Sequence, residues 1–274
     1  MADDLDNRQD VDVYATPPRR SYQFIQLDTA QGIARIVLNR PPANVLSIEM
    51  MEEMNAALDT LEYAREVKLL VIMATGKYFS AGFEIGELMG DRSYMMLEGF
   101  RRIFENLAKL DKPTLAVVGG SAFGAGSALA VGCDIVLAAA SAKFGHPEIK
   151  GGVFNTVAAA MLPRLVGPKK AYEMILHGIS LTAADAEKLG LVSRVVADDK
   201  LNEELGLIIQ KFQEGSAPIL QATRRAIAGG LDLPFLDAVR HAEDVYLNTL
   251  MATEDFEEGL RAIMGKRKPA WKDR

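Results

Sequence analysis

Two short stretches of this chain each pass from an apolar run, through a few small residues, into the start of a helix. The first reads G-K-Y-F-S-A-G-F-E-I at residues 76–85, and the second reads S-A-F-G-A-G-S-A-L-A-V-G-C-D at residues 121–134. With the apolar segments around them, they give the order strand, helix, strand, helix along residues 68–138. Alternation of this kind predicts an α/β architecture with short parallel-type crossovers.

The pattern divides the chain into three parts. Residues 1–20 are polar and end in P-P-R-R, so we expect a flexible N-terminal tail. Residues 21–200 are expected to form the α/β core, and residues 201–274 a C-terminal helical region. Apolar periodicity predicts a hairpin of strands at 22–27 and 32–38, a helix at 48–61 capped by Ser47, further helices at 94–109 and 126–131, and strands at 68–74, 114–118 and 134–138.

The composition excludes several classes of protein. Of 274 residues, 49% are hydrophobic, enough for a sizeable core, but every apolar run is far shorter than the ~20 residues that span a bilayer. Cys133 is the only cysteine and there are three histidines, so we expect neither an intrachain disulfide nor a metal site. The net charge of −6 argues against a nucleic-acid surface. The acidic N-terminus lacks the features of a secretory signal, and we expect a cytoplasmic location.

The small-residue turns are also candidate sites of chemistry. The second turn has G-x-G without the third glycine of a dinucleotide site, and Ser80 does not lie in the G-x-S-x-G elbow of serine hydrolases. The first N–H groups of a helix have no helical acceptor and carry partial positive charge. If the amides of Phe83 and Ala125 converged on a carbonyl oxygen, they would stabilise an enolate or a tetrahedral oxyanion. The alternative is that the glycines only allow close packing.

Four motifs in fixed order resemble those of the enoyl-CoA hydratase/isomerase family, also called the crotonase family. They are L-N-R-P-P-A-N-V-L-S-I-E-M-M, G-K-Y-F-S-A-G-F-E-I-G-E-L, V-V-G-G-S-A-F-G-A-G-S-A-L-A-V-G-C-D and F-G-H-P-E-I-K-G-G-V-F. The resemblance implies a spiral of β-β-α units followed by a C-terminal helical trimerisation region, and a homotrimer or hexamer. It also implies an acyl-CoA thioester as ligand, with coenzyme A as part of the substrate and no separate cofactor.

The resemblance also implies which residues act. The oxyanion hole corresponds to the N–H groups of Phe83 and Ala125, and the acid/base group to Glu148. Typical hydratases of the family have a second glutamate, but this chain has Ala128 there. His146 either orients Glu148 or a water, or only fills the wall. The positions expected to contact substrate are Ala43, Val45, Ala81, Gly82, Ile85, Gly124, Ala128, His146 and Lys266, the last meeting CoA phosphates from the same or a neighbouring subunit.

The missing glutamate leaves three functions open. Short motifs of the sequence resemble those of the cyclohexadienoyl-CoA hydratases, which favours hydration of an enoyl-CoA or a cyclic dienoyl-CoA. A single glutamate in the P-E motif also resembles the Δ3,Δ2-enoyl-CoA isomerases. Thr156 stands where the family's dehalogenases and dienoyl-CoA isomerases carry an acid, which disfavours both. The third alternative is a non-catalytic acyl-CoA-binding subunit.

Overall fold

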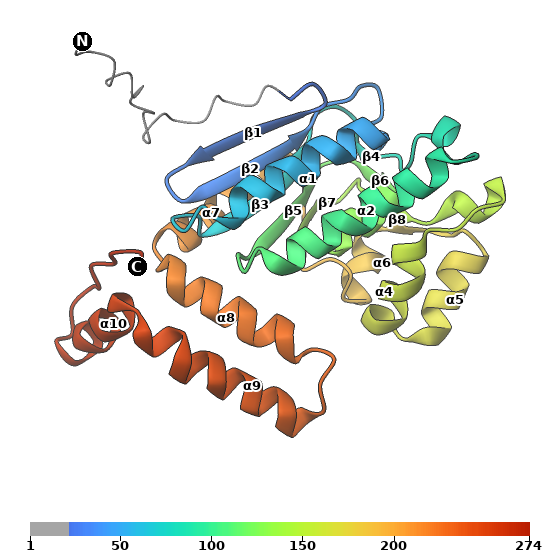
Figure 1. Ribbon diagram of the computed structural model, residues 1–274. Coiled ribbons are helices and arrows are strands. Elements are labelled where there is room, and N and C mark those ends of the chain that lie inside the picture. Colours follow the sequence, from blue (N-terminus) through green and yellow to red (C-terminus); the bar gives the residue numbers. More distant parts are fainter. Residues whose placement is uncertain (1–21) are drawn as a thin grey trace, which may run out of the picture.

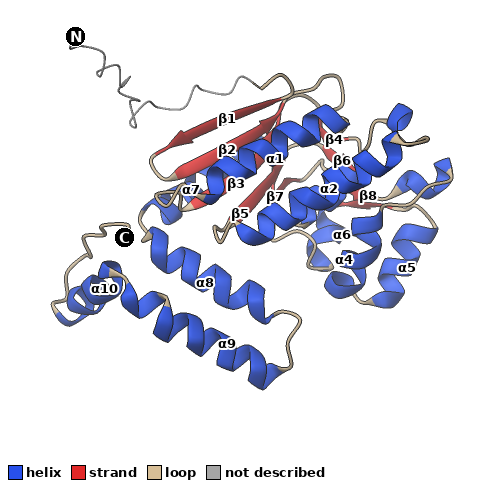
Figure 2. Cartoon of the chain, in the orientation of Figure 1, coloured by secondary structure: helices blue, strands red, loops and turns tan. Residues whose placement is uncertain are grey.

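A six-stranded sheet forms the centre of the protein, whose computed structural model describes residues 22–274 (Figures 1 and 2). Its order is β1-β2-β3-β5-β7-β10, with bounds β1 (Ile25–Ala30), β2 (Ile33–Leu38), β3 (Leu69–Ala74), β5 (Thr114–Val118), β7 (Ile135–Ala139) and β10 (Arg194–Val196). Only the β1–β2 pair is antiparallel. The predicted α/β class and the N-terminal hairpin are therefore confirmed.

A second, smaller sheet packs beside the first and carries the turns singled out above. It has four short strands in the order β4-β6-β8-β9, with bounds β4 (Tyr78–Ser80), β6 (Ser121–Phe123), β8 (Lys143–Gly145) and β9 (Ser180–Thr182). The first three run parallel, and β9 is antiparallel to β8. Each strand has three residues, too few to show an apolar period, so the periodicity analysis missed this sheet.

The larger sheet is buried on both faces, as expected for parallel strands joined by helices. One face packs against helices α1 (Ile48–Glu62), α2 (Arg92–Lys109) and α3 (Ala125–Val131), with Ile36, Leu70 and Ile72 among the residues of that core. The opposite face packs against α7 (Leu201–Gln213), which contributes Leu205. Ser47 caps α1 as predicted, because its side chain accepts a hydrogen bond from the Met50 N–H.

The remaining helices lie on two sides of this core. Helices α4 (Thr156–Val166), α5 (Pro168–Leu176) and α6 (Ala183–Lys188) lie near the small sheet, whereas α8 (Ala217–Gly230), α9 (Phe235–Asn248) and α10 (Glu254–Met264) extend away from it (Figure 1). No helix within residues 22–274 is both long and apolar enough to cross a membrane.

Most predicted elements are present with small shifts in their ends. β1 was expected at 22–27 with a turn from 28 to 32, which is wrong: β1 extends to Ala30, and the turn is formed by Gln31 and Gly32 at positive φ. The predicted flexible tail at 1–20 lies outside the described residues. The division of the chain at residue 200 stays a prediction, and α7, the first helix beyond it, packs against the larger sheet.

Candidate active site

The two small-residue turns meet at the carboxyl ends of neighbouring strands of the small sheet. Residues 81–83 follow β4, and Gly124 follows β6, which pairs with β4 in parallel. Gly82 has φ 104°, and a Cβ atom there would lie 3.2 Å from the Phe123 carbonyl oxygen and 3.6 Å from the Ala125 nitrogen. The two turns therefore touch, and glycine is required by both the left-handed backbone and the close approach.

The N–H of Phe83 is free because of how its neighbours pair. The Gly82 carbonyl accepts from the Leu46 N–H at 2.7 Å, and the Glu84 N–H donates to the Leu46 carbonyl at 3.0 Å. In an extended segment, successive residues point their N–H groups to opposite sides, so the Phe83 N–H faces away from Leu46. No acceptor for this N–H lies within residues 22–274.

The Ala125 amide is free for a different reason. Ala125 is the first residue of α3, and Gly124 before it supplies no side-chain cap, so the Ala125 N–H has no helical acceptor. The Ala128 N–H donates to the Gly124 carbonyl at 3.0 Å, which closes the first helical turn. Among the described residues, none accepts a hydrogen bond from Ala125 N–H. The structure thus brings two unpaired amides to the same pair of turns.

Glu148 presents its carboxylate to this pair of turns. It lies on the 3-10 turn η2 (Pro147–Gly151), directly after β8, which pairs with β6. The Gly124 N–H donates to the Gly145 carbonyl at 2.8 Å, and a Cβ atom on Gly124 would lie only 2.6 Å from Glu148 Oε1. The absence of a side chain at Gly124 therefore lets the carboxylate lie beside the Ala125 amide.

The carboxylate of Glu148 is enclosed, and no described residue forms a hydrogen bond with it. Its side chain is 16% exposed, yet both oxygens are buried and neither has a hydrogen-bond partner within the described part of the chain. His146 is 2% exposed, and its Nδ1 lies 3.9 Å from Glu148 Oε1, beyond hydrogen-bond distance. Both His146 ring nitrogens are likewise buried without partners. Buried polar groups are normally paired, so this cluster is exceptional.

Ala128 lies one helical turn beyond Gly124 and is fully buried. Residues four apart share a helix face, so a longer side chain at position 128 would extend towards the Glu148 side of α3. The methyl group of Ala128 supplies no proton donor or acceptor. The described site therefore contains one carboxylate, that of Glu148, packed against Gly124.

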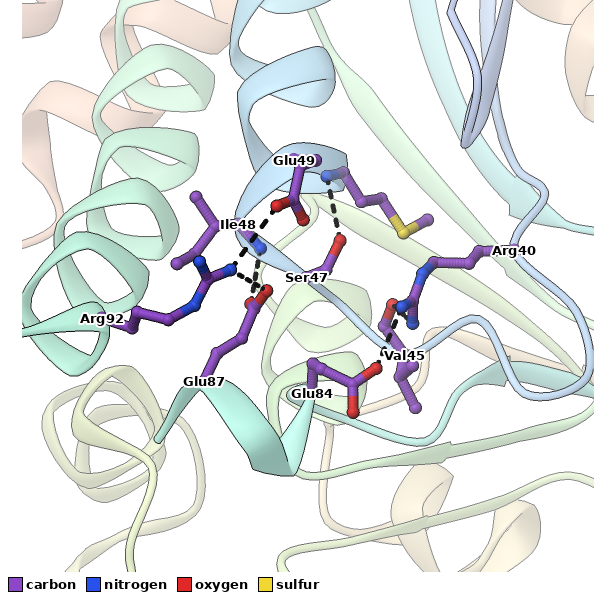
Figure 3. Close-up of polar contacts among 9 residues, drawn as sticks. Arg40, Val45, Ser47, Ile48, Glu49, Glu84, Glu87 and Arg92 are labelled. Carbon is purple, nitrogen blue, oxygen red and sulfur yellow. Dashed lines mark hydrogen bonds and ion pairs between the residues drawn. The ribbon is translucent and has the colours of Figure 1, made fainter. Parts of the chain in front are cut away.

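The loop before α1 holds the Phe83 segment in place, and the sequence analysis did not single out the residues responsible. Arg40 donates to the Val45 carbonyl at 3.3 Å and pairs with Glu84 Oε2 at 3.0 Å (Figure 3). Asn44 is buried and its backbone has a positive φ of 48°; its side chain donates to the Tyr78 carbonyl at 2.9 Å. The Ala81 N–H donates to the Ala43 carbonyl at 2.9 Å. The only signal for these contacts was the position of Arg40 and Asn44 within the R-P-P-A-N-V-L motif.

A second anchor joins the segment after Phe83 to the start of α1. Glu87 is 6% exposed, accepts from the Ile48 N–H at 2.8 Å, and pairs with Arg92 at 2.7 Å (Figure 3). Arg92 also approaches Glu49 at 3.5 Å. Ile85 begins the short turn between Phe83 and Glu87 and is 78% exposed. The segment is therefore fixed at both ends while its apolar side chain faces outward.

The predicted substrate contacts fall into two places. Ala43, Val45, Ala81, Gly82 and Ile85 lie on the two segments joined by these anchors, and Gly124, Ala128 and His146 lie around Glu148. Lys266 follows α10, and α10 lies away from the small sheet (Figure 1). It is exposed and forms no ion pair with the described residues. The structure does not bring Lys266 to the other candidates.

Cys133 and Asp134, which lie between α3 and β7, have structural contacts. Burial raises the pKa of the Cys133 thiol to about 12, so the thiol stays neutral near pH 7. Asp134 accepts hydrogen bonds from the Thr114 N–H and hydroxyl and pairs with Arg224 at 2.8 Å. No group of three or more metal-ligating side chains occurs within residues 22–274. An apolar cavity of about 330 Å³ lies beyond Ile149 and Phe154, and Glu148 does not line it.

Comparisons with known proteins agree with the motifs. Residues 28–274 match the model of the enoyl-CoA hydratase/isomerase family. The chain is 38% identical over 257 residues to a probable enoyl-CoA hydratase of Rhizobium meliloti (strain 1021), covering 93% of this chain and 100% of that protein. It is 33% identical to the mitochondrial enoyl-CoA hydratase of Pongo abelii, covering 88% and 84%. The crystal structure of enoyl-CoA hydratase from Bacillus anthracis superposes with a TM-score of 0.86 at 28% identity, covering 92% and 100%.

Proposed function

Because this chain belongs to the enoyl-CoA hydratase/isomerase family, we propose that it adds water to an α,β-unsaturated acyl-CoA with Glu148 as its single carboxylate acid/base. The chain is a crotonase-fold, acyl-CoA enzyme of the enoyl-CoA hydratase-like lyase type. The observation that carries the finer proposal is the position of the Glu148 carboxylate, unpartnered and packed against Gly124 next to the Ala125 amide.

In the proposed reaction, the thioester oxygen accepts hydrogen bonds from the N–H groups of Phe83 and Ala125. A water oxygen forms a bond to the β carbon, and one water proton passes to Glu148. The electrons of the carbon–carbon double bond move towards the thioester oxygen, giving an enolate that the two amides stabilise. One such donor is commonly worth about 2.7 to 4 kcal/mol. Glu148 then returns the proton to the α carbon, so the carboxylate is regenerated and all atoms of water are in the product.

We propose a cyclic dienoyl-CoA as the preferred substrate over a short linear enoyl-CoA. The support is the side chain of Ala128, a methyl group one turn beyond Gly124 on α3, where typical hydratases of the family carry a glutamate. A ring needs more width beside the reacting carbons than a linear chain. Exposed Ile85 and Met89, on the segment that follows Phe83, offer further apolar surface for an acyl group.

The proposal is tested by mass spectrometry of thioesters incubated with the purified protein. Crotonyl-CoA, cyclohexa-1,5-diene-1-carbonyl-CoA and a 3-enoyl-CoA are supplied separately, and a gain of one water is sought. Gain on the cyclic dienoyl-CoA is the expected result. Gain on crotonyl-CoA alone would retain hydration and reject the cyclic substrate.

The alternative is a Δ3,Δ2-enoyl-CoA isomerase, which the presence of one carboxylate favours because double-bond migration needs one group to carry one proton. In that case the 3-enoyl-CoA would change retention time without a change in mass, and the other two thioesters would stay unchanged. A non-catalytic acyl-CoA-binding subunit would leave all three unchanged while binding them, which calorimetry would detect.

We also propose that the active form is a homotrimer or hexamer in which Lys266 meets the CoA phosphates of a neighbouring subunit. Two observations support this. Lys266 is exposed and follows α10, which lies away from the small sheet (Figure 1). Helices α9 and α10 also expose several large apolar side chains, namely Phe235, Leu236, Tyr246, Leu247, Ile263 and Met264. Light scattering should give three or six times the chain mass of 29.8 kDa. A monomer that binds CoA at full strength would contradict the proposal.

A further inference from the structure

His146 is the second titratable group enclosed at the candidate site, and the proposed reaction gives it no part. Six buried side-chain nitrogen or oxygen atoms lack a hydrogen-bond partner within residues 22–274, and four of them belong to His146 and Glu148. Leaving a buried donor or acceptor unsatisfied costs about 1–3 kcal/mol. Four such atoms in two adjacent side chains indicate that a small polar molecule binds between the two side chains during function.

The separation of the two side chains suits a single water. His146 Nδ1 and Glu148 Oε1 are 3.9 Å apart, too far for a direct hydrogen bond. Hydrogen bonds of about 2.8 Å from one water oxygen to both atoms enclose an angle of roughly 90°, which a water can adopt. The same Oε1 is the heavy atom closest to where a Cβ atom on Gly124 would lie, and Gly124 directly precedes Ala125. A water shared by the two side chains is therefore bound to the Glu148 oxygen that lies towards the Gly124–Ala125 turn.

We propose that His146 and Glu148 together hold the water that adds to the β carbon, with His146 as a second catalytic residue of the hydration reaction. This inference rests on the proposed function. Before reaction, the water donates one hydrogen bond to Glu148 Oε1 and the other to His146 Nδ1. His146 is then the neutral tautomer that carries its proton on Nε2. Both water protons are then held, and an oxygen lone pair is left to attack carbon.

The imidazole takes no net proton in this scheme. As the water oxygen bonds to the β carbon, its proton on the Glu148 side moves to that carboxylate and later to the α carbon. The proton on the His146 side stays on oxygen and becomes the hydroxyl hydrogen of the product. His146 thus supplies the second hydrogen-bond acceptor that Ala128, with its methyl group, lacks.

Two variants at His146 separate this function from a structural one. His146→Phe keeps a planar ring but removes both nitrogens, whereas His146→Gln keeps a polar acceptor in a side chain of similar reach. The control is His177→Gln, which changes an exposed histidine at the end of α5. The substrates are crotonyl-CoA and cyclohexa-1,5-diene-1-carbonyl-CoA, and deuterium uptake at the α carbon of butyryl-CoA and cyclohexanecarbonyl-CoA is followed in D₂O.

The expected result is a split between the two reactions. His146→Phe should lower kcat for hydration about 100-fold with KM within about threefold of wild type, because the loss affects the water and not the thioester. Deuterium uptake should stay near the wild-type rate, since it needs only Glu148 and the two amides. The melting temperature should not fall, because the variant removes two unsatisfied buried atoms. His146→Gln should recover part of the lost kcat, and His177→Gln should match wild type.

The inference is overturned if His146→Phe hydrates at the wild-type rate, or if it loses hydration and deuterium uptake to the same extent, as a role in folding or in orienting Glu148 would require. A failure of the proposed function looks different. A wild-type protein that adds no water to either thioester rejects the hydratase proposal itself. A wild type that adds water but takes up no deuterium rejects the proton return from Glu148, and the kcat and KM of the two variants still decide the part of His146.

Discussion

Glu148 and Asp255 are both enclosed carboxylates, and they differ in whether the chain satisfies them. Asp255, fully buried at the start of α10, accepts hydrogen bonds from the N–H groups of Lys272 at 2.7 Å and Asp273 at 3.0 Å. Glu148, at the end of the small sheet, accepts none from the described residues. The carboxylate that fastens the C-terminus is paired by its own chain, whereas the Glu148 carboxylate has no hydrogen-bond partner among the described residues, as we propose for a group that meets a ligand.

The surroundings of the two groups extend the contrast. Around Asp255, the last residues are held by several further contacts: the Trp271 indole donates to the Glu214 carbonyl at 2.8 Å, and Asp273 pairs with Lys68 at 3.0 Å. The Phe83 segment of the candidate site is also held by side-chain contacts, in the Arg40–Glu84 pair and the Glu87 anchor (Figure 3). The described residues thus pair the segments that frame the candidate site and leave Glu148 and His146 within it without hydrogen-bond partners.

The largest effect should follow from Glu148→Gln. Removing the group that moves the proton should lower kcat about 10³-fold, while the free energy of unfolding stays the same or rises because a buried unpaired charge is gone. Steady-state kinetics and urea unfolding measure both quantities. Glu98→Gln, at an exposed carboxylate on α2, is the matched control and should change neither. A Glu148→Gln protein with a lower free energy of unfolding and an unchanged kcat would contradict the contrast with Asp255.

Asp255→Ala should show the opposite pattern. Two backbone N–H groups lose a charged acceptor, and hydrogen bonds to charged groups contribute about 1.5–3 kcal/mol each, so we expect the free energy of unfolding to fall by about 3 kcal/mol. The kcat of the folded protein should be unchanged. Asp255→Asn, which keeps one acceptor oxygen, should lie between the two in urea unfolding. A tenfold loss of kcat in the folded Asp255→Ala protein would contradict the claim that Asp255 contributes to stability and not to activity.

Arg40→Met should have a smaller effect on catalysis. Arg40 joins the Val45 carbonyl of the loop before α1 to Glu84, the residue after Phe83, so its loss should let the Phe83 amide shift. We expect kcat to fall about tenfold with little change in the melting temperature. Glu84→Gln should reproduce the loss in part, and the double variant should be no worse than Arg40→Met alone. Fully additive losses in kcat would show that the pair does not act as a unit.

The smallest effect concerns pH and the C-terminal region. Hydrogen bonds from Arg267 and from the Ala270 N–H lower the pKa of Glu258 from 4.5 to about 2. A depressed carboxyl pKa contributes stability above the unfolded value of 4.5, and that contribution is lost as the pH falls to about 2. The Glu258 side chain is 17% exposed and that of its partner Arg267 is 47% exposed, so solvent screens the pair and the effect is small. Thermal unfolding of Glu258→Gln should differ slightly from wild type at pH 6 and match it near pH 2; a difference that grows on acidification would contradict this.

Much of the fold could be predicted from the sequence because its elements are long enough to show a period. Helix α1 repeats apolar residues at helical spacing behind the Ser47 cap, and strands β3 and β5 are continuous apolar runs. The small sheet could not be predicted in this way, since three-residue strands such as β4 and β6 carry no period. Its place in the fold comes from tertiary pairing between segments some 40 residues apart.

Only part of the candidate site could be predicted from the sequence. The small residues around Phe83 and Ala125 indicated two free amides, because only short side chains allow the turns to touch. The unpartnered state of His146 and Glu148 could not be read from the sequence, since it depends on what the rest of the fold places around them. The same holds for Arg40, whose partner Glu84 lies 44 residues away in the chain.

The most direct measurement is the rate of water addition to crotonyl-CoA and cyclohexa-1,5-diene-1-carbonyl-CoA by wild type, Glu148→Gln and Asp255→Asn, followed by mass spectrometry. We predict that wild type and Asp255→Asn add one water to at least one of the two thioesters at similar rates, and that Glu148→Gln adds it at least about 100-fold more slowly. Equal rates for wild type and Glu148→Gln would contradict the assignment of the unpaired carboxylate as the reactive group.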